Sequence, residues 1–499
     1  MFTPLDFVVL IFYFVVTMGV GVYFYRKTRS VEGFTAANRS LPGWVVGFSI
    51  LATYVSSISF LANPGKSFDT NWNPFVFSLS LIIATPIAVR YFLPYYRSSN
   101  EVSAYSHLER RFGPWARFYV GVCYLLMQLA RMGTVMYLMA LPLSLLLQWD
   151  IRVIIVVTGV CVTAYTFLGG IVAVIWTDAI QCIILMAGAL LCLILMIFNL
   201  PEGPSQLFEV AKEYDKFSLG SFGLSFAEPT FWVVLAYGVI INFTNFGIDQ
   251  NYVQRYIAAK SDAEARKSLW LGGLLFLPVS AMFFLIGTAL FAFYQFNELP
   301  QAQRDNPDTA FPYYIVTELP PGITGLLIAA VFAAAMSTVS TSLNSSATLI
   351  LTDHYKRYIR PDATEKQSMS VLYSSTIVWG VLGTLLAWAI IGNKSALDTW
   401  WVLSGILAGG MVGIFLLGMI ARRAGNVAGV TAAVIGVLVI LWMTLPSLYD
   451  QFKLDVESLG GFKSPFHKFL IPVFGTSTIV LIGWLLGVML NDRRQKDSA

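Results

Sequence analysis

The sequence predicts an all-α polytopic membrane protein with about 13 transmembrane helices, and three observations support that fold class. The first is composition. Of the 499 residues, 57% are hydrophobic and only 12% are charged, which is about half the charge of a typical soluble domain. The second is a series of apolar runs, each long enough to cross a bilayer as a helix. The third is a set of basic residues that recurs in alternate loops.

The apolar runs give the predicted spans. The first run, 4–25, ends at Arg26 and Lys27 and lacks a small-residue cleavage site, so we expect a retained helix rather than a signal peptide. The remaining runs lie at 43–63, 73–96, 115–147, 151–169, 171–198, 228–250, 267–296, 321–352, 369–392, 396–420, 426–446 and 468–490. Little sequence is left for a soluble domain.

Basic side chains indicate which loops share a side of the membrane. They gather in loops at 26–29, 110–117, 255–267, 356–360, 422–423 and 493–496. By the positive-inside rule these loops are cytoplasmic, so thirteen spans place the N-terminus outside and the C-terminus inside. In two of the longer outer loops we expect short helices, at Gln206–Tyr214 and Pro312–Glu318.

Motifs of several other function classes are missing from the sequence. No nucleotide-binding loop, paired carboxylates or nucleophile elbow is present, so we expect no enzyme. The four cysteines lie in apolar runs without metal-ligand spacing. No ring of like charges or filter-like loop indicates a channel. We also expect no nucleic acid partner and no obligatory protein partner.

An oxygen-rich stripe lies inside the apolar run Gly322–Leu351, in the stretch A-A-A-M-S-T-V-S-T-S-L-N-S-S at 333–346. Hydroxyl groups often form hydrogen bonds between membrane helices, and that is one interpretation of the stripe. The other is a site for a small hard cation bound by neutral oxygens, and the stripe alone leaves both open. At helical spacing the stripe consists of Ser337, Ser340, Thr341 and Asn344 on one face, with Thr338 and Ser345 on a flank.

Two spans contain polar, helix-poor patches, at 52–59 and 242–249. The spans are five apart in the predicted order. Broken helices at matching places in two five-helix halves indicate an inverted-repeat transporter with its binding site near the middle of the membrane. Unpaired backbone is tolerated there only where it lines a cavity or binds a ligand.

Arg131 lies near the centre of the fourth run, where an arginine costs roughly 3 kcal/mol on insertion scales. Gln128 lies on the same helical face. Either Arg131 forms a buried salt bridge with Asp178, which we interpret as the sole deep carboxylate, or it binds the carboxylate of an anionic substrate. Asp178 could instead face the hydroxyl stripe near Thr341 and supply the negative charge of a cation site.

Three separated motifs resemble the sodium/solute symporter family: G-G-I-V-A-V-I-W-T-D-A-I-Q (169–181), D-Q-N-Y-V-Q-R-Y (249–256) and F-A-A-A-M-S-T-V-S-T-S-L-N-S (332–345). The resemblance implies a LeuT-like core of two inverted five-helix repeats with extra helices. The implied division of the chain is an extra N-terminal helix (1–30), a first repeat (41–198), a second repeat (228–420), and C-terminal helices with a short tail (421–499).

Within the family the sequence is most similar to bacterial sodium/sialic acid symporters, whose first core helix resembles P-G-W-V-V-G-F-S-I-L-A-T-Y-V-S-S-I-S-F (42–60). The likeness implies a principal sodium site of Ala52, Val55, Ala334, Ser337 and Thr338. It implies a second sodium site, present in only some members, of Asp178, Ser340 and Thr341. Substrate contacts are expected from Tyr54, Ser56, Ser59, Ser78, Gln128 and Arg131. Tyr54 and Ser78 depart from the family pattern, which has Thr and Gln there.

The implied function is sodium-coupled import of a small organic anion by alternating access. The expected cargo is sialic acid (N-acetylneuraminate) or a related acidic sugar. The alternatives are a neutral sugar or another carboxylate as cargo, or a transporter-like membrane sensor. The expected partners are therefore sodium ions, the small-molecule substrate and the lipid bilayer, and the expected location is a bacterial inner (plasma) membrane.

Overall fold

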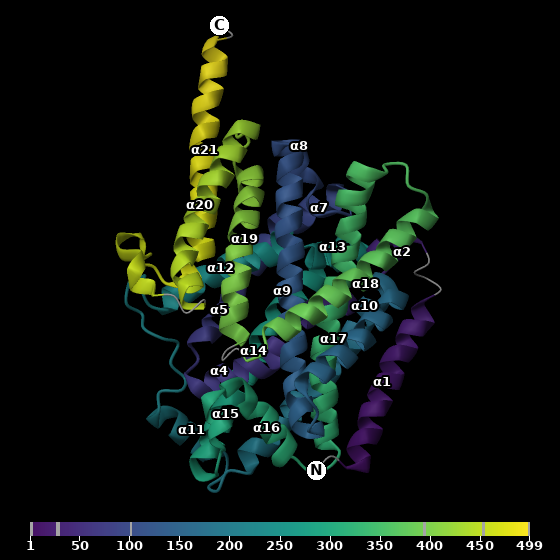
Figure 1. Cartoon of the computed structure of the whole chain (residues 1–499), viewed down its shortest axis with the longest axis vertical. Coiled ribbons are helices and arrows are strands. Elements are labelled where there is room, and N and C mark those ends of the chain that lie inside the picture. Colours follow the sequence, from purple (N-terminus) through teal and green to yellow (C-terminus); the bar gives the residue numbers. More distant parts are fainter. Residues whose placement is uncertain (1–2, 26–29, 100–101, 393–395, 452–454, 498–499) are drawn as a thin grey trace.

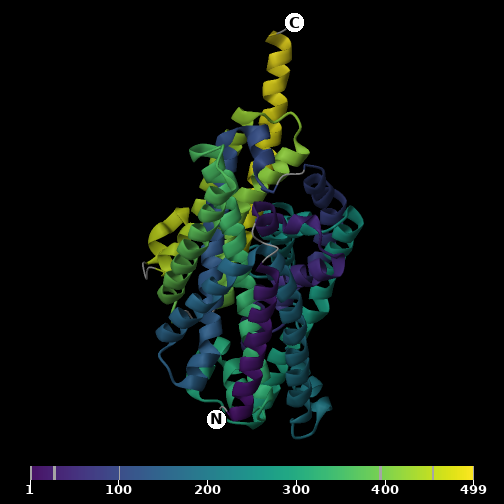
Figure 2. The ribbon, with the colours of Figure 1, turned by 90° about the vertical axis from the view of Figure 1, so that its right-hand side faces the viewer.

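The computed structural model of the chain describes residues 3–25, 30–99, 102–392, 396–451 and 455–497. Within these ranges the secondary structure is helical, apart from one isolated bridge between Leu41 and Ala259. Most long helices run between the two ends of the molecule, and the N-terminus and C-terminus lie at opposite ends (Figures 1 and 2). An odd number of membrane crossings gives this arrangement.

The predicted apolar runs all fall on helices. In the described part of the chain, ten helices are long and apolar enough to span a membrane, and one bent pair adds an eleventh. The helices that carry the runs are α1 (Pro4–Tyr25), the pair α3 (Gly43–Tyr54) and α4 (Asn63–Asp69), the series α5 (Val76–Leu79), α6 (Leu81–Ile87) and α7 (Leu93–Ser99), α9 (Pro114–Leu147), α10 (Ile151–Phe198), α12 (Phe231–Ile248), α14 (Asp262–Phe296), α17 (Ile323–Leu349), α18 (Glu365–Ala389), α19 (Ala396–Ile420), α20 (Asn426–Gln451) and α21 (Ile471–Asp497).

Helix α10 carries two predicted runs, which meet at Gly170. This residue has a φ of 53° and a ψ of −170°, a conformation that only glycine adopts without strain. A Cβ atom at this position would also lie 2.9 Å from the Phe34 ring. The chain therefore turns between the runs 151–169 and 171–198, as the sequence predicts.

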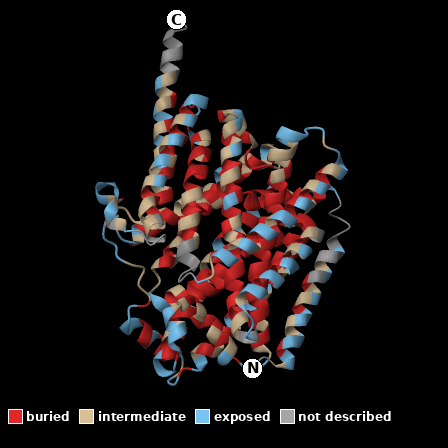
Figure 3. Ribbon diagram, viewed as in Figure 1, coloured by how far each residue is buried: buried red, intermediate tan, exposed pale blue. Residues whose placement is uncertain are grey.

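Helix α17 forms the centre of the molecule. Nearly all of its side chains are buried, and it packs against α1, α9, α10 and α18 (Figure 3). The outer helices instead expose large apolar side chains, such as Phe12 of α1, Val381 of α18 and Leu438 of α20. In a bilayer these exposed groups face lipid, so the fold places polar oxygens inside and hydrocarbon outside.

Two helices are broken where the sequence predicts. Helices α3 and α4 meet at an angle of 57° across the break after Tyr54. Helix α12 ends at Ile248, Asp249 has an extended backbone, and α13 (Gln250–Ala258) starts at the next residue. The two broken spans are five apart in chain order.

The connecting helices separate into two groups. Helices α11 (Pro204–Glu213) and α16 (Ala310–Thr317) lie near the end of the molecule that holds the N-terminus, and both were expected from the sequence. Helices α2 (Val31–Ala36) and α8 (Ser106–Phe112) lie toward the end that holds the C-terminus (Figure 1). The loop assignment is wrong for Arg255, which lies within α13 and has a fully buried side chain.

Candidate substrate and cation sites

The first helix break is stabilised by its own side chains. Val55 caps α3 with a φ of −87° and a ψ of 93°, which ends the helix. The Ser59 hydroxyl donates to the Tyr54 carbonyl at 2.9 Å, and the Ser57 hydroxyl donates to the Val135 carbonyl at 3.0 Å. The Ser56 hydroxyl accepts from the Ile58 amide at 3.2 Å. Serines therefore replace part of the backbone hydrogen bonding lost at the break.

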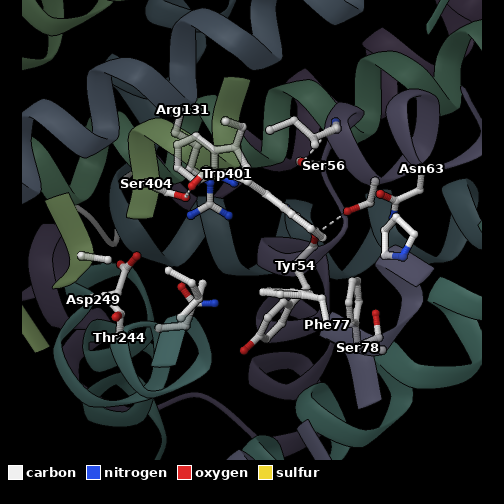
Figure 4. A pocket seen from close by; sticks show the side chains of 18 of the residues that line it. Tyr54, Ser56, Asn63, Phe77, Ser78, Arg131, Thr244, Asp249, Trp401 and Ser404 are labelled. Carbon is white, nitrogen blue, oxygen red and sulfur yellow. Dashed lines mark hydrogen bonds between the residues drawn. The ribbon is translucent and has the colours of Figure 1, made fainter. Parts of the chain in front are cut away.

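A cavity of about 90 Å³ lies against this break. Tyr54, Ser56 and Ser59 come from the first broken span, and Thr244, Asn245 and Asp249 come from the second. Arg131 of α9 and Trp401 and Ser404 of α19 close one side, and Phe77 and Ser78 close another (Figure 4). The cavity thus lies between the two broken helices, where a transporter of this architecture binds its cargo.

Arg131 lines the cavity, and its guanidinium donates to the Thr53 carbonyl, one of those released at the end of α3. The guanidinium carbon lies 6.0 Å from the centre of the Trp400 ring. Asp249 lines the same cavity, and its carboxylate accepts from the Asn251 amide at 2.8 Å as the N-cap of α13. One cationic group and one anionic group therefore face the same cavity.

Asp178 forms a salt bridge, but its partner is Arg255 and not Arg131. The two side chains are completely buried, and Arg255 Nη2 lies 2.7 Å from Asp178 Oδ2. Asp178 also accepts from the hydroxyls of Ser49 and Ser337, both at 2.6 Å. It is not the sole deep carboxylate, because Asp249 is only 1% exposed. Long-range packing supplies both partners, and the linear sequence does not show it.

Arg255 has the buried hydrogen-bond partners that a guanidinium needs. It donates to the Ser49 hydroxyl at 2.8 Å, to the Asn251 carbonyl at 2.8 Å and to the Thr341 hydroxyl at 2.9 Å. Helices α3, α10, α13 and α17 thus meet at one charged cluster. This cluster occupies the position where the sequence predicts the second sodium site.

The hydroxyl stripe of α17 divides into two parts. Toward the C-terminal end of the helix the polar groups join helices, since Ser345 accepts from the Tyr124 hydroxyl at 2.8 Å and Ser342 donates to Gln128 at 2.7 Å. The Asn344 amide donates to the Phe34 carbonyl at 3.3 Å. The earlier part, from Ser337 to Thr341, lies against the Asp178 cluster. Interhelical hydrogen bonding therefore occurs along the stripe, and a cation site at Ser337–Thr341 stays a prediction.

The remaining predicted residues are placed as follows. The Tyr54 hydroxyl donates to Asn242 Oδ1 at 2.8 Å, and the Ser78 hydroxyl donates to Ser280 at 2.7 Å. The Thr338 hydroxyl donates to the Ala334 carbonyl at 3.1 Å. Gln128 does not line the cavity, because its Oε1 accepts from Asn251 and Ser342 instead.

Sequence reasoning missed Arg255 and Asp249 as buried charges and Trp400 and Trp401 as cavity walls. A signal existed for each. Asp249 ends the helix-poor patch at 242–249, and Arg255 follows Asn251 by one helical turn within the quoted motif. The adjacent tryptophans stand at the start of a span, where an aromatic pair is also typical of an interfacial anchor.

The two broken helices, the cavity between them and the partly buried arginine that faces it define a secondary transporter of the LeuT-like class. The chain belongs to the sodium:solute symporter family, whose model matches residues 34–436. The chain is therefore an integral membrane, sodium-coupled transporter and not an enzyme.

Individual relatives are similar over nearly the whole chain. The sodium/sialic acid symporter NanT of Aliivibrio fischeri is 32% identical, over 99% of this chain and 95% of the relative. The sodium/sialic acid symporter SiaT of Proteus mirabilis is 31% identical, over 98% and 96%. A solved structure of a Na⁺-coupled sialic acid symporter, substrate-bound and outward-open, superposes with a TM-score of 0.88 at 30% identity and 98% coverage of both chains.

Proposed function

We propose that the protein imports sialic acid, or a closely related acidic sugar, together with sodium by alternating access. The observation that carries the proposal is Arg131, which faces a cavity at the break of α3. Full-length similarity to sodium/sialic acid symporters supports the same cargo. The direction of transport follows the predicted orientation, with the N-terminus outside, in a bacterial inner membrane.

The cavity offers a carboxylated sugar two kinds of contact. The Arg131 guanidinium suits a carboxylate, because its planar group of donors matches two oxygens at once. Ser56, Asn245 and Asp249 offer hydroxyl, amide and carboxylate groups for the sugar hydroxyls. A substrate carboxylate would sit at the Arg131 side, away from the like charge of Asp249.

The principal sodium site is proposed at the crossing of α3 and α17, which are in contact. The carbonyl of Ala52 is among the last four of α3, which have no partner inside the helix. Among the described residues, no donor bonds this carbonyl. Together with the Val55 and Ala334 carbonyls and the Ser337 and Thr338 hydroxyls, it would provide the neutral oxygens that a hard cation prefers.

The second sodium site is proposed at Asp178, Ser340 and Thr341, on the condition that Arg255 moves away. In the described arrangement the guanidinium already neutralises Asp178 and bonds Thr341. A sodium ion at that point would meet a fixed positive charge. We therefore propose that the principal site binds first, and that the second forms only in a conformation that separates Arg255 from Asp178.

In this conformation the cavity is smaller than ligand pockets usually are. About 90 Å³ is well below the roughly 300 Å³ at which ligand pockets usually begin. Alternating access requires the two broken spans to separate from α9 and α19 on one side and then on the other. Each proposed repeat, 41–198 and 228–420, contributes one of the broken spans to the part that would move.

A ligand screen on the purified protein tests the cargo. A ligand that binds only the folded state raises the melting temperature. We expect N-acetylneuraminate to raise it in sodium and to have a much smaller effect in potassium, whereas glucose and pantothenate leave it unchanged. Stabilisation by glucose or pantothenate, with none by N-acetylneuraminate, would replace the proposed cargo with a neutral sugar or another carboxylate.

A further inference from the structure

A second cavity, of about 460 Å³, adjoins the cargo cavity. The two share Pro74 and Trp401 as lining residues, so these side chains form the partition between them. The second cavity lies among the end of α4, the loop before α12 and the loop before α21. In the predicted orientation these segments face the outside, so the second cavity precedes the cargo cavity on the way in.

The walls of this outer cavity are fixed by hydrogen bonds between distant segments. Lys216 is 4% exposed, and its ammonium donates to the carbonyls of Phe68 and Thr70 at 2.7 and 2.8 Å. Asn73 donates to the Leu219 carbonyl at 2.9 Å. The wall is therefore built by specific contacts between α4 and the loop before α12.

The charges that line the outer cavity favour an anion. Lys66 and Lys468 contribute two ammonium groups, and Glu228 contributes one carboxylate, so the formal sum is positive even with His467 neutral. Glu228 is exposed to water, whereas both lysines are partly buried. A cleft with low-dielectric walls concentrates the field of its charges and raises the local concentration of the opposite ion.

The floor of the outer cavity suits a sugar ring. It consists of Trp401 and Phe469, whose ring centres are 4.9 Å apart. Aromatic faces stabilise the C–H surface of a polyol, while amides and hydroxyls around them bond its hydroxyl groups. The volume of about 460 Å³ also falls in the range of ligand pockets, unlike that of the cargo cavity.

We propose that the outer cavity is a capture site, where an anionic sugar binds at Lys66 and Lys468 above Trp401 before it enters the cargo cavity. The inference rests on the proposed function for the identity of the ligand. It adds a second, weaker site to the path. Because none of the proposed sodium ligands lines the outer cavity, binding at the capture site is expected to be independent of sodium.

Uptake kinetics in proteoliposomes, with N-acetylneuraminate as the probe, test the capture site. The variant Lys66→Gln/Lys468→Gln removes both ammonium groups. Its matched control is Lys212→Gln in α11, at the same end of the molecule and outside the cavity. We expect the double variant to raise KM on the order of 10-fold with kcat unchanged, and added choline chloride to shrink the difference. A KM equal to that of the control would overturn the proposal.

Equilibrium binding to an Arg131→Ala background gives an independent readout. We expect this variant to retain weak binding of N-acetylneuraminate that is the same in sodium and potassium, and to lose it when Lys66→Gln/Lys468→Gln is added. No binding to the Arg131→Ala protein would reject the capture site. Failure of the proposed function is distinguishable, because the unsubstituted protein would then show no sodium-dependent uptake.

Discussion

At the residue scale, two arginines have different surroundings, since Arg255 is fully buried and Arg131 is partly buried. Arg255 is surrounded by partners and completes a network with Asp178, Ser49 and Thr341. Arg131 instead faces a cavity. A buried guanidinium whose hydrogen bonds are complete stabilises the fold, whereas one that faces a cavity can exchange part of its environment for a ligand. The pair therefore separates a structural role from a binding role.

Arg131 gives the first prediction. Arg131→Ala should lower kcat/KM for N-acetylneuraminate by a factor of roughly 30 to 5,000, because truncating one partner of a buried charge pair costs about 2–5 kcal/mol. Arg131→Lys should recover little of the loss, since an ammonium lacks the planar pair of donors. Initial uptake rates measure the effect. Wild-type kinetics in the Arg131→Ala protein would remove the basis of the proposed anion site.

The Asp178–Arg255 salt bridge gives the second prediction. Arg255→Met should destabilise the protein by about 3–5 kcal/mol, because it leaves Asp178 buried without its counter-charge. Adding Asp178→Asn should restore much of that stability. Melting of the purified variants measures both effects, and equal melting of Arg255→Met and the unsubstituted protein would show that the pair contributes little.

At the element scale, salt bridges between charged side chains hold the C-terminal end of the central helix, α17, in place. Helix α17 continues as a π-helix (Ile350–Ile359), and Asp353 in it accepts from Arg117 of α9 at 2.6 Å. Glu109 of α8 accepts from Arg117 at 2.9 Å and from Arg357. This cluster joins α8, α9 and α17 at the end of the molecule opposite the N-terminus. It fixes the helix that carries the proposed sodium ligands.

Glu109 makes this connection dependent on pH. Hydrogen bonds from Arg357 and then Arg117 hold the pKa of Glu109 below its ordinary value of 4.5, although burial opposes them. The folded state therefore binds this proton less readily than the unfolded state. The contribution of Glu109 to stability is complete above the ordinary pKa and is lost as the pH falls through the folded-state pKa.

The third prediction follows from the loss of the Glu109 contribution at low pH. The melting temperature should fall as the pH drops below about 4.5, and Glu109→Gln should flatten part of this fall while lowering stability at pH 7 by about 1 kcal/mol. Glu213→Gln, an acidic position in α11, is the control. If Glu109→Gln and Glu213→Gln show the same pH profile as the unsubstituted protein, the ionic cluster does not stabilise this end of the fold.

At the scale of the whole molecule, the sequence predicted the helical framework well because long apolar runs and polar, helix-poor patches are local signals. The sequence indicated the division of α10 at Gly170 and the breaks near Val55 and Asp249. The charged cluster was not, because the positive-inside rule assigns an arginine such as Arg255 to a loop unless its buried partner is known. That partner, Asp178, lies far away in the sequence.

The hydroxyl stripe of α17 also shows that spacing in the sequence does not reveal which neighbour each side chain contacts. Spacing places Ser337 and Ser345 on related faces of one helix, but their neighbours decide what they do. The Ser337 hydroxyl donates to Asp178, whereas the Ser345 hydroxyl accepts from Tyr124 of α9. Helices α9 and α10 pack against different parts of α17, and this packing gives Ser337 and Ser345 different partners. The sodium ligands and substrate contacts named from the resemblance stay predictions.

The central claim is that an inward sodium gradient drives accumulation of the cargo. Proteoliposomes loaded with potassium and diluted into sodium buffer with labelled N-acetylneuraminate test it most directly. The account predicts accumulation above the external concentration, which disappears when choline replaces sodium. With the membrane potential set negative inside, a substrate-evoked current would add evidence for a second sodium ion, since each net charge gains about 2.3 kcal/mol per 100 mV. Equal accumulation in choline would contradict the account.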